Sequence, residues 1–456
     1  MREVSCFADA TSPSLPVTPV SPSELGGWLD AQPENISAFV KAAGFRAQPG
    51  RVLALPGPSG ASGFVAGRDE KDPLWPGALA SALPEGVYRL EGFSGETLEN
   101  AAQAWGLGAY QFTNYKQPKR APARLALPMG APSRDTMAAI EAAYFVRDLV
   151  NTPASDLGPA EIETAARDLA ARHDAKLSAV VGDELLSEGL NLIHAVGRGS
   201  ARAPRLIDMR WGRKEDPKLT LVGKGVVFDT GGLDIKPSSG MILMKKDMGG
   251  AAHALGLAHM IMTAGLPLRL RVLVPTVENA ISGDAYRPSD IIKSHKGLTV
   301  EIGNTDAEGR LILADALSVA DAEAPDLIID MATLTGAARS ALGPELPALF
   351  TDDDALATEL AVAGSAEHDP LWRMPLWQPY AKFLDSPVAD INNAGSSSFA
   401  GAITAALFLK RFVEQAKSWA HLDIYAWSPS NGPTRSVGGE AQCLRTIFRV
   451  LKNRYS

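Results

Sequence analysis

The feature that most constrains the fold is an alternation, in the second half of the chain, of short apolar runs with longer segments of helical spacing. Short apolar runs of this kind are typical of buried strands. Strands are expected at Leu219–Val222, Leu268–Val274, Leu327–Ile329, Ala348–Phe350 and Leu422–Ala426. Helices are expected at Gly249–Thr263, Arg310–Glu323 and Ala402–Gln415. This order predicts an α/β fold in which helices cover a mixed or largely parallel sheet.

The first 130 residues carry a similar mixture in a smaller α/β unit. Its expected helices are Asn35–Ala43 and Ser94–Gly106, and its expected strands are Val52–Leu55 and Val87–Leu90. The segment Ser12–Pro22 contains four prolines among Ser and Thr residues, which favours a loop.

A domain boundary is expected at Lys116–Pro132, which is rich in Pro, Ala and basic residues. A helix should follow, because Ser133 can cap its start and Pro153 forces its end near Asn151. We therefore expect an N-terminal α/β domain at 1–132, a connecting helix at 133–152 and a larger C-terminal domain at 153–456.

The composition limits the classes of function. The 456 residues include 44 basic and 52 acidic side chains, and no part of the chain is strongly basic. This even acidity disfavours a nucleic-acid partner. The only cysteines, Cys6 and Cys443, lie at opposite ends, which argues against a disulfide framework or a cysteine zinc site. The polar N-terminus has no signal-peptide pattern, and no apolar stretch suits a membrane span, so we expect a cytoplasmic protein.

Three segments carry acidic residues at the ends of expected buried elements. In Val222–Gly232, a strand leads into Lys224 and Asp229, and Lys236 follows. The phosphate-loop pattern is absent, and the simple alternative is a turn-capping Asp229 with two solvated lysines. Asp247 stands where a helix begins, so capping alone could explain it.

The third segment, Gly303–Leu311, contains Asp306 and Glu308, which lie two residues apart and would point to one side in extended backbone. Four converging carboxylates would repel one another strongly unless cations were bound. No H-E-x-x-H motif occurs, and the seven histidines are scattered, which disfavours a histidine zinc site. The three segments together predict a carboxylate-rich centre for two metal ions.

These segments resemble the leucyl aminopeptidases, or cytosol aminopeptidases, of the two-metal, lysine-containing class. The most specific string of that family, N-T-D-A-E-G-R, is unbroken at Asn304–Arg310. Further matches are Lys224 to Lys236, Asp247 to Ala252, Asn151–Pro153, Val196–Ser200, Ala332–Gly336 and Trp419–Asp423. The resemblance covers about residues 146–427 and implies a small macro-like N-terminal domain and a metallopeptidase catalytic domain with a mixed sheet.

The resemblance implies a role for each matched residue. One metal would be held by Lys224, Asp229, Asp247 and Glu308, and the other by Asp229, Asp306 and Glu308. The metals would be Zn or Mn, with Mg or Co as alternatives, and would share a hydroxide that attacks the carbonyl of the first residue of a peptide.

Two further residues would be catalytic by resemblance. Lys236 would donate to the developing oxyanion, and Arg310 would hold a bicarbonate ion that shuttles protons. Met244, Thr333, Leu334 and Gly336 would bind the substrate and favour leucine or another apolar first residue. The segment from Tyr425 to Gln442 departs from the family, which leaves the preference for leucine itself open.

The resemblance also implies partners. Peptides with a free N-terminus would be the substrates, and the chain would form a homohexamer. An additional DNA-binding, regulatory role is the alternative function, because some members of the family have one.

Overall fold

The computed structural model describes all 456 residues, which form two compact units. The smaller unit contains Arg2–Tyr144 and Pro429–Val437, and the larger contains Met1, Phe145–Ser428 and Gly438–Ser456. The division falls within helix α5 (Arg134–Asn151), which lies where the connecting helix was expected. No helix combines the length and the apolar character that crossing a membrane requires.

The smaller unit is built on a six-stranded sheet with the order β1-β6-β5-β2-β4-β3, in which only β3 is antiparallel to its neighbour. Its strands are β1 (Phe7–Asp9), β2 (Leu15–Val20), β3 (Val52–Gly57), β4 (Gly60–Gly67), β5 (Val87–Leu90) and β6 (Arg124–Leu127). Its helices are α1 (Leu25–Asp30), α2 (Glu34–Ala42), the 3₁₀ helix η1 (Trp75–Ala78), α3 (Leu79–Ala82) and α4 (Gly95–Gly108). Apolar side chains of α3 and α4 pack with those of β2 and β6 in one buried cluster.

One expectation for this unit is wrong. The segment Ser12–Pro22 is not a loop, because its residues Leu15–Val20 form β2 between β5 and β4. Pro16 and Pro19 cannot donate to the sheet, but their fixed φ suits an extended chain, and Val17 and Val20 are buried. Strand β6, the partner of β1 and β5, lies within Lys116–Pro132, and the domain boundary expected in that segment stays a prediction.

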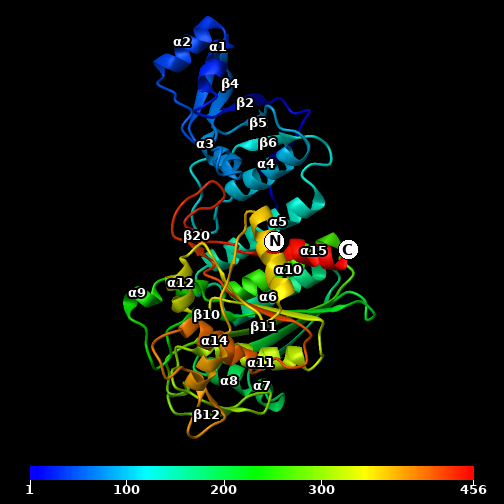
Figure 1. The fold of residues 1–456 in the computed structure, drawn as a ribbon, viewed down its shortest axis with the longest axis vertical. Helices are drawn as coiled ribbons and strands as arrows, with labels where there is room; N and C mark the ends of the chain where they lie inside the picture. Colours follow the sequence, from blue (N-terminus) through cyan, green and yellow to red (C-terminus); the bar gives the residue numbers. More distant parts are fainter. The chain divides into compact units, whose positions relative to one another are not determined.

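The larger unit is built on a nine-stranded mixed sheet (Figure 1). Its path is β16-β15-β18-β14-β9-β11-β8-β7, and β10 pairs with β11. The strands β18, β14, β9 and β11 are parallel, and antiparallel strands lie at both ends. The bounds are β7 (Lys176–Val181), β8 (Arg205–Trp211), β9 (Lys218–Gly223), β10 (Gly225–Asp229), β11 (Arg269–Asn279), β14 (Leu327–Ala332), β15 (Ala348–Phe350), β16 (Trp372–Arg373) and β18 (Trp419–Asp423).

Helices cover this sheet in two groups. Helix α10 packs on β9 and β14 together with α6 and α15, whereas α11 packs on β9 and β11 together with α8 and α14. The helices are α6 (Pro159–Arg172), α7 (Glu184–Ser187), α8 (Asn191–Gly197), α9 (Ser238–Met241), η2 (Met244–Lys246), α10 (Gly249–Ala264), α11 (Glu308–Asp321), α12 (Gly336–Leu342), α13 (Asp354–Ala366), η3 (Gln378–Leu384), α14 (Gly401–Lys410) and α15 (Leu444–Tyr455). Short strands form two small ladders, β12 (Ile291–Lys293), β13 (Thr299–Glu301) and β17 (Ile391–Asn392), and β19 (Trp427–Ser428) with β20 (Gly438–Gly439). The expected α/β fold with a helix-covered mixed sheet is confirmed.

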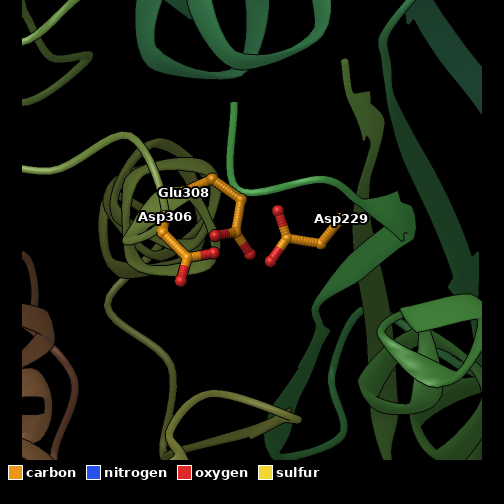
Figure 2. Close-up of side chains that lie close together, drawn as sticks. All are labelled: Asp229, Asp306 and Glu308. Atoms are coloured by element: carbon orange, nitrogen blue, oxygen red, sulfur yellow. The ribbon is translucent and has the colours of Figure 1, made fainter. Parts of the chain in front are cut away.

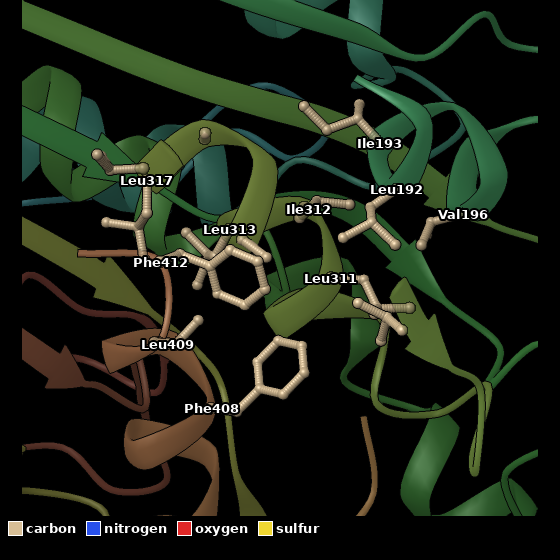
Figure 3. Close-up of a cluster of buried hydrophobic side chains, with 14 of the residues drawn as sticks. Leu192, Ile193, Val196, Leu311, Ile312, Leu313, Leu317, Phe408, Leu409 and Phe412 are labelled. Atoms are coloured by element: carbon tan, nitrogen blue, oxygen red, sulfur yellow. The ribbon is translucent and has the colours of Figure 1, made fainter. Parts of the chain in front are cut away.

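A buried cluster fixes the position of α11 (Figure 3). Leucine and isoleucine side chains of α11 pack against α8 and against two phenylalanines, Phe408 and Phe412, at the end of α14. Burying each large apolar side chain contributes roughly 1.5–3 kcal/mol. Helix α11 begins at Glu308, so this core also fixes the position of that acidic residue.

Candidate functional site

The three acidic segments meet at the ends of neighbouring elements. Asp229 is the last residue of β10, Asp247 lies two residues before α10, and Asp306 and Glu308 stand at the start of α11. Figure 2 shows the carboxylates of Asp229, Asp306 and Glu308 turned toward one another. One oxygen of each lies within 4.8 Å of the others. The predicted convergence of these carboxylates is present in the structure.

Burial and a neighbouring negative charge raise the pKa values of two of these carboxylates. Burial is the largest cause for Glu308 and the charge of Asp229 the next, and together they raise the pKa of Glu308 to about 8. The same two causes raise the pKa of Asp306 to about 6. Closely spaced carboxylates of this kind are hard to ionise together without cations. The donor set therefore fits one or more divalent ions.

Two lysines supply the positive charge nearest to these carboxylates. The Lys224 side chain is 1% exposed, and its Nζ lies 3.1 Å from Glu308 and also contacts Asp247. Burial lowers the pKa of Lys224, but the charges of Asp247 and Glu308 outweigh it, so the net shift is upward. Nζ of Lys236 lies 2.8 Å from Asp229 and also contacts Asp306.

Hydrogen bonds from other segments orient the acidic residues. Asn279, at the end of β11, donates to Oδ1 of Asp229 at 2.8 Å, and the backbone N–H of Gly231 donates to the same oxygen. The hydroxyl of Thr333 donates to Oδ1 of Asp247 at 2.8 Å. The expected substrate residue Thr333 therefore also holds Asp247 in place.

A cavity of about 470 Å³ opens beside this cluster. Its walls include Lys224, Asp229, Lys236, Asp247, Asp306 and Glu308, together with the expected substrate residues Met244, Thr333, Leu334 and Gly336. Asp423 fixes one wall, because its carboxylate accepts hydrogen bonds from the backbone of Leu334 and from the backbone and hydroxyl of Thr335.

Arg310 differs from the other expected site residues, because it is not among those that line the cavity. Its Nη1 donates to the backbone carbonyl of Asn393 at 2.7 Å, whereas its Nε is buried without a partner. Burial lowers the pKa of Arg310 to about 10, although the charges of Glu308 and Asp423 act to raise it.

Asn279 and Asp423 support the site, although no single segment of the sequence predicts this role for them. Asn279 is completely buried, and its contacts to Asp229 and to the carbonyl of Thr305 come from distant parts of the chain. Nothing near Asn279 in the sequence marks it. Asp423 ends the matched string Trp419–Asp423, which is the one signal that could have found it.

Comparisons with known proteins identify the family. The model of the "Cytosol aminopeptidase family, catalytic domain" matches residues 144–448, and that of the "M17 aminopeptidase, N-terminal domain" matches residues 15–128. A probable cytosol aminopeptidase of Sinorhizobium medicae is 38% identical over 95% of this chain and 94% of its own length. One from Roseiflexus castenholzii is 43% identical over 76% of this chain and 74% of its own.

Solved structures agree in both fold and sequence. The crystal structure of a cytosol aminopeptidase from Coxiella burnetii is 47% identical, with a TM-score of 0.95 over 99% of this chain and 100% of the other. The bottromycin maturation enzyme BotP, in complex with Mn, is 34% identical, with a TM-score of 0.85 over 97% of this chain and 100% of that chain. The chain therefore belongs to the cytosol aminopeptidase family and is a metal-dependent aminopeptidase that acts on the N-terminus of peptides.

Proposed function

We propose that Lys224, Asp229, Asp247, Asp306 and Glu308 hold two divalent metal ions that this chain uses to remove the first residue of a peptide. The observation that carries the proposal is their convergence on one wall of a cavity large enough for a peptide end. The raised pKa values of Asp306 and Glu308, which burial and the charge of Asp229 cause, support bound cations at this wall.

The donor set supports hard or borderline metals. Carboxylate oxygens with one amine, and no thiolate or imidazole, suit Mn, Mg, Co or Zn. The Mn complex of BotP favours manganese among these. Two such ions, when bound, supply an acidified water and polarise the scissile carbonyl.

The chain's own residues would orient the substrate and stabilise charge. Lys236 reaches the cavity from the loop after β10, and its ammonium would donate to the oxygen that becomes negative in the transition state. The unpartnered Nε of Arg310 supports an anion beside it, for which bicarbonate is our proposal. Met244 and Leu334 give the cavity apolar wall, which supports a preference for leucine or another apolar first residue.

Assembly and location extend the proposal. We propose a homohexamer, which light scattering would test, since a mass of 48.2 kDa at micromolar concentration would contradict it. The names of the relatives support a cytoplasmic location. The comparisons lend no support to the DNA-binding alternative.

The decisive experiment combines metal removal with a blocked substrate. The metal-stripped protein should be inactive on Leu-Gly-Gly and regain activity with Mn or Zn. Acetyl-Leu-Gly-Gly should resist cleavage, because the acetylated nitrogen cannot bind a metal and orient the scissile bond. Mass spectrometry of the products gives both rates, and similar rates for the two peptides would overturn the proposed binding of the free amine.

A variant pair tests the ligand assignment. Asp306→Ala should lose bound metal and activity together. The matched control is Asp352→Ala, which removes an exposed carboxylate paired with Lys410 at 2.8 Å. Elemental analysis of both variants decides, and a full metal complement in Asp306→Ala would remove Asp306 from the ligand set.

A further inference from the structure

Two cationic side chains lie against one aromatic ring on the cavity wall. Nζ of Lys246 lies 5.0 Å from the centre of the Tyr425 ring, and the guanidinium carbon of Arg339 lies 4.9 Å from it. All three residues line the same cavity as the acidic cluster. The cavity is therefore lined by these two cations as well as by the acidic cluster.

The ammonium of Lys246 forms no direct ion pair with an acidic side chain. The residue is 4% exposed, and its ammonium forms no ion pair. The adjacent carboxylate of Asp247 is engaged with Lys224 and Thr333. The carboxylate of Asp423 is engaged with the loop that follows β14. The charges of Asp247 and Asp423 act on the Lys246 ammonium, but neither carboxylate forms the direct ion pair that buried cations ordinarily have.

Arg339 contacts the same aromatic ring. It belongs to helix α12 and is exposed, and its contact is the face of Tyr425. The face of an aromatic ring attracts a cation electrostatically, and the cation's N–H groups stay available to donate hydrogen bonds to a ligand. A guanidinium in this state is suited to grip a planar carboxylate through two parallel hydrogen bonds.

We propose that Lys246 and Arg339 form a carboxylate subsite within the substrate cavity, with Tyr425 as the platform that holds both cations. The carboxylate would be the C-terminal group of a short peptide or the side chain of an acidic residue. The subsite rests on the proposed function, since it adds a second contact to a peptide whose first residue lies at the acidic wall. It would make this chain selective for short or acidic peptides.

Two matched substrate pairs separate the sources of the carboxylate. Leu-Leu and Leu-Leu-amide differ only in the terminal charge, and the fluorogenic coumarin amides of Glu and Gln differ only in the charge of the first side chain. The ratio of kcat/KM within each pair is the measured quantity, because general damage to the enzyme cancels in it. A charge-assisted contact of this kind should favour the charged member of at least one pair by about tenfold.

The variants are Lys246→Met and Arg339→Gln, and the control is Lys245→Met. Lys245 also lies over an aromatic ring, 5.7 Å from the centre of Trp427, but is not among the residues that line the cavity. Both cavity variants should bring the responding ratio to within about twofold of unity, whereas the control should keep the wild-type ratio. Ratios that neither cavity variant changes would overturn the subsite.

The two pairs have different meanings. A response of the Leu-Leu pair assigns the subsite to the chain terminus, and a response of the Glu–Gln pair assigns it to an acidic first residue and replaces the apolar preference proposed above. If the wild type cleaves no leucyl peptide, the proposed function fails. Calorimetric titration of Leu-Leu and its amide into the same proteins then gives the affinity ratio without turnover, and equal affinities in wild type and variants would overturn the subsite by itself.

Discussion

Replacing Gly309 with alanine tests whether the position of Lys224 governs activity. Gly309 is the second residue of α11, directly after Glu308. A Cβ there would lie 2.8 Å from Cδ of Lys224 and closer still to Cε. Lys224 is enclosed, with 1% of its surface exposed, so its side chain has little free space to move into.

The overlap between the added Cβ and the Lys224 side chain sets the size of the expected effects on stability and rate. Non-bonded carbons rest about 3.5–4.0 Å apart, so the end of the Lys224 stem must move by at least about 1.5 Å. Overpacking of this kind lowers the free energy of unfolding by about 1–3 kcal/mol. Alanine in place of glycine in a helix raises it by about 1 kcal/mol. The fold should therefore survive with a loss of at most about 2 kcal/mol. A displacement of about 1 Å at a reacting site can lower the rate by about 10²-fold.

We expect Gly309→Ala to keep its circular dichroism spectrum but to lose about 100-fold in kcat/KM and part of its bound metal. The control is Gly27→Ala, in helix α1, where an added Cβ meets nothing within 4 Å. That variant should keep wild-type activity. Wild-type kinetics and metal content in Gly309→Ala would show that the position of the Lys224 amine does not affect activity. That result would contradict the proposed role of Lys224 as a metal ligand.

Two more predictions concern Lys236 and the buried pair behind the site. Lys236→Ala should lower kcat by about 10²–10³ while elemental analysis finds the metals retained, and loss of metal would contradict the role of oxyanion donor. Asp330 accepts hydrogen bonds from His421 and Trp419 in the sheet, so Asp330→Asn should lower the free energy of unfolding in urea by about 3–5 kcal/mol. Burial lowers the pKa of His421, but the charge of Asp330 outweighs it and the net shift is upward. The stabilisation is then complete below the unfolded-state pKa of about 6.5 and is lost as the pH rises through the folded-state pKa, so the cost of Asp330→Asn should be larger at pH 6 than at pH 9.

The same buried pair explains why one strand was displaced in the sequence analysis. The apolar run predicted a strand at Leu422–Ala426, but the strand is Trp419–Asp423. His421 interrupts the apolar pattern, and it is tolerated at 0% exposure because Asp330, opposite it in β14, supplies a charge and an acceptor. A partner 91 positions away leaves no trace in a local pattern.

Elements whose burial is continuous were predicted well. The helix expected at Gly249–Thr263 is α10 (Gly249–Ala264), and the strand at Ala348–Phe350 has the expected bounds. Their apolar residues need no specific partner, since any packed neighbour satisfies them. The prediction of a loop at the proline-bearing strand β2 was wrong for a different reason. The position of β2 depends on specific partners, the strands that pair with both of its edges.

The residues of the site also fall into those that the sequence predicts and those that it does not. Asp229, Asp247, Asp306 and Glu308 could be found because each stands at the end of an element whose own pattern is local. Asn279 and the cationic pair on Tyr425 could not, since their meaning arises only when distant segments meet.

The depths of the two active-site lysines support the separate roles proposed for them. The side chain of Lys224 is 1% exposed and lies between Asp247 and Glu308, whereas that of Lys236 is 15% exposed and lies over Asp229 and Asp306. A lysine that serves as a ligand must give up its proton. Burial of Lys224 acts in that direction, but the charges of Asp247 and Glu308 outweigh it, so a bound cation would be needed to bring the amine to its neutral form. A lysine that stabilises an oxyanion must keep its proton and reach the substrate, which a more open position allows. The same residue type would therefore serve both functions in one site, because the fold buries the amine of Lys224 and leaves that of Lys236 more open.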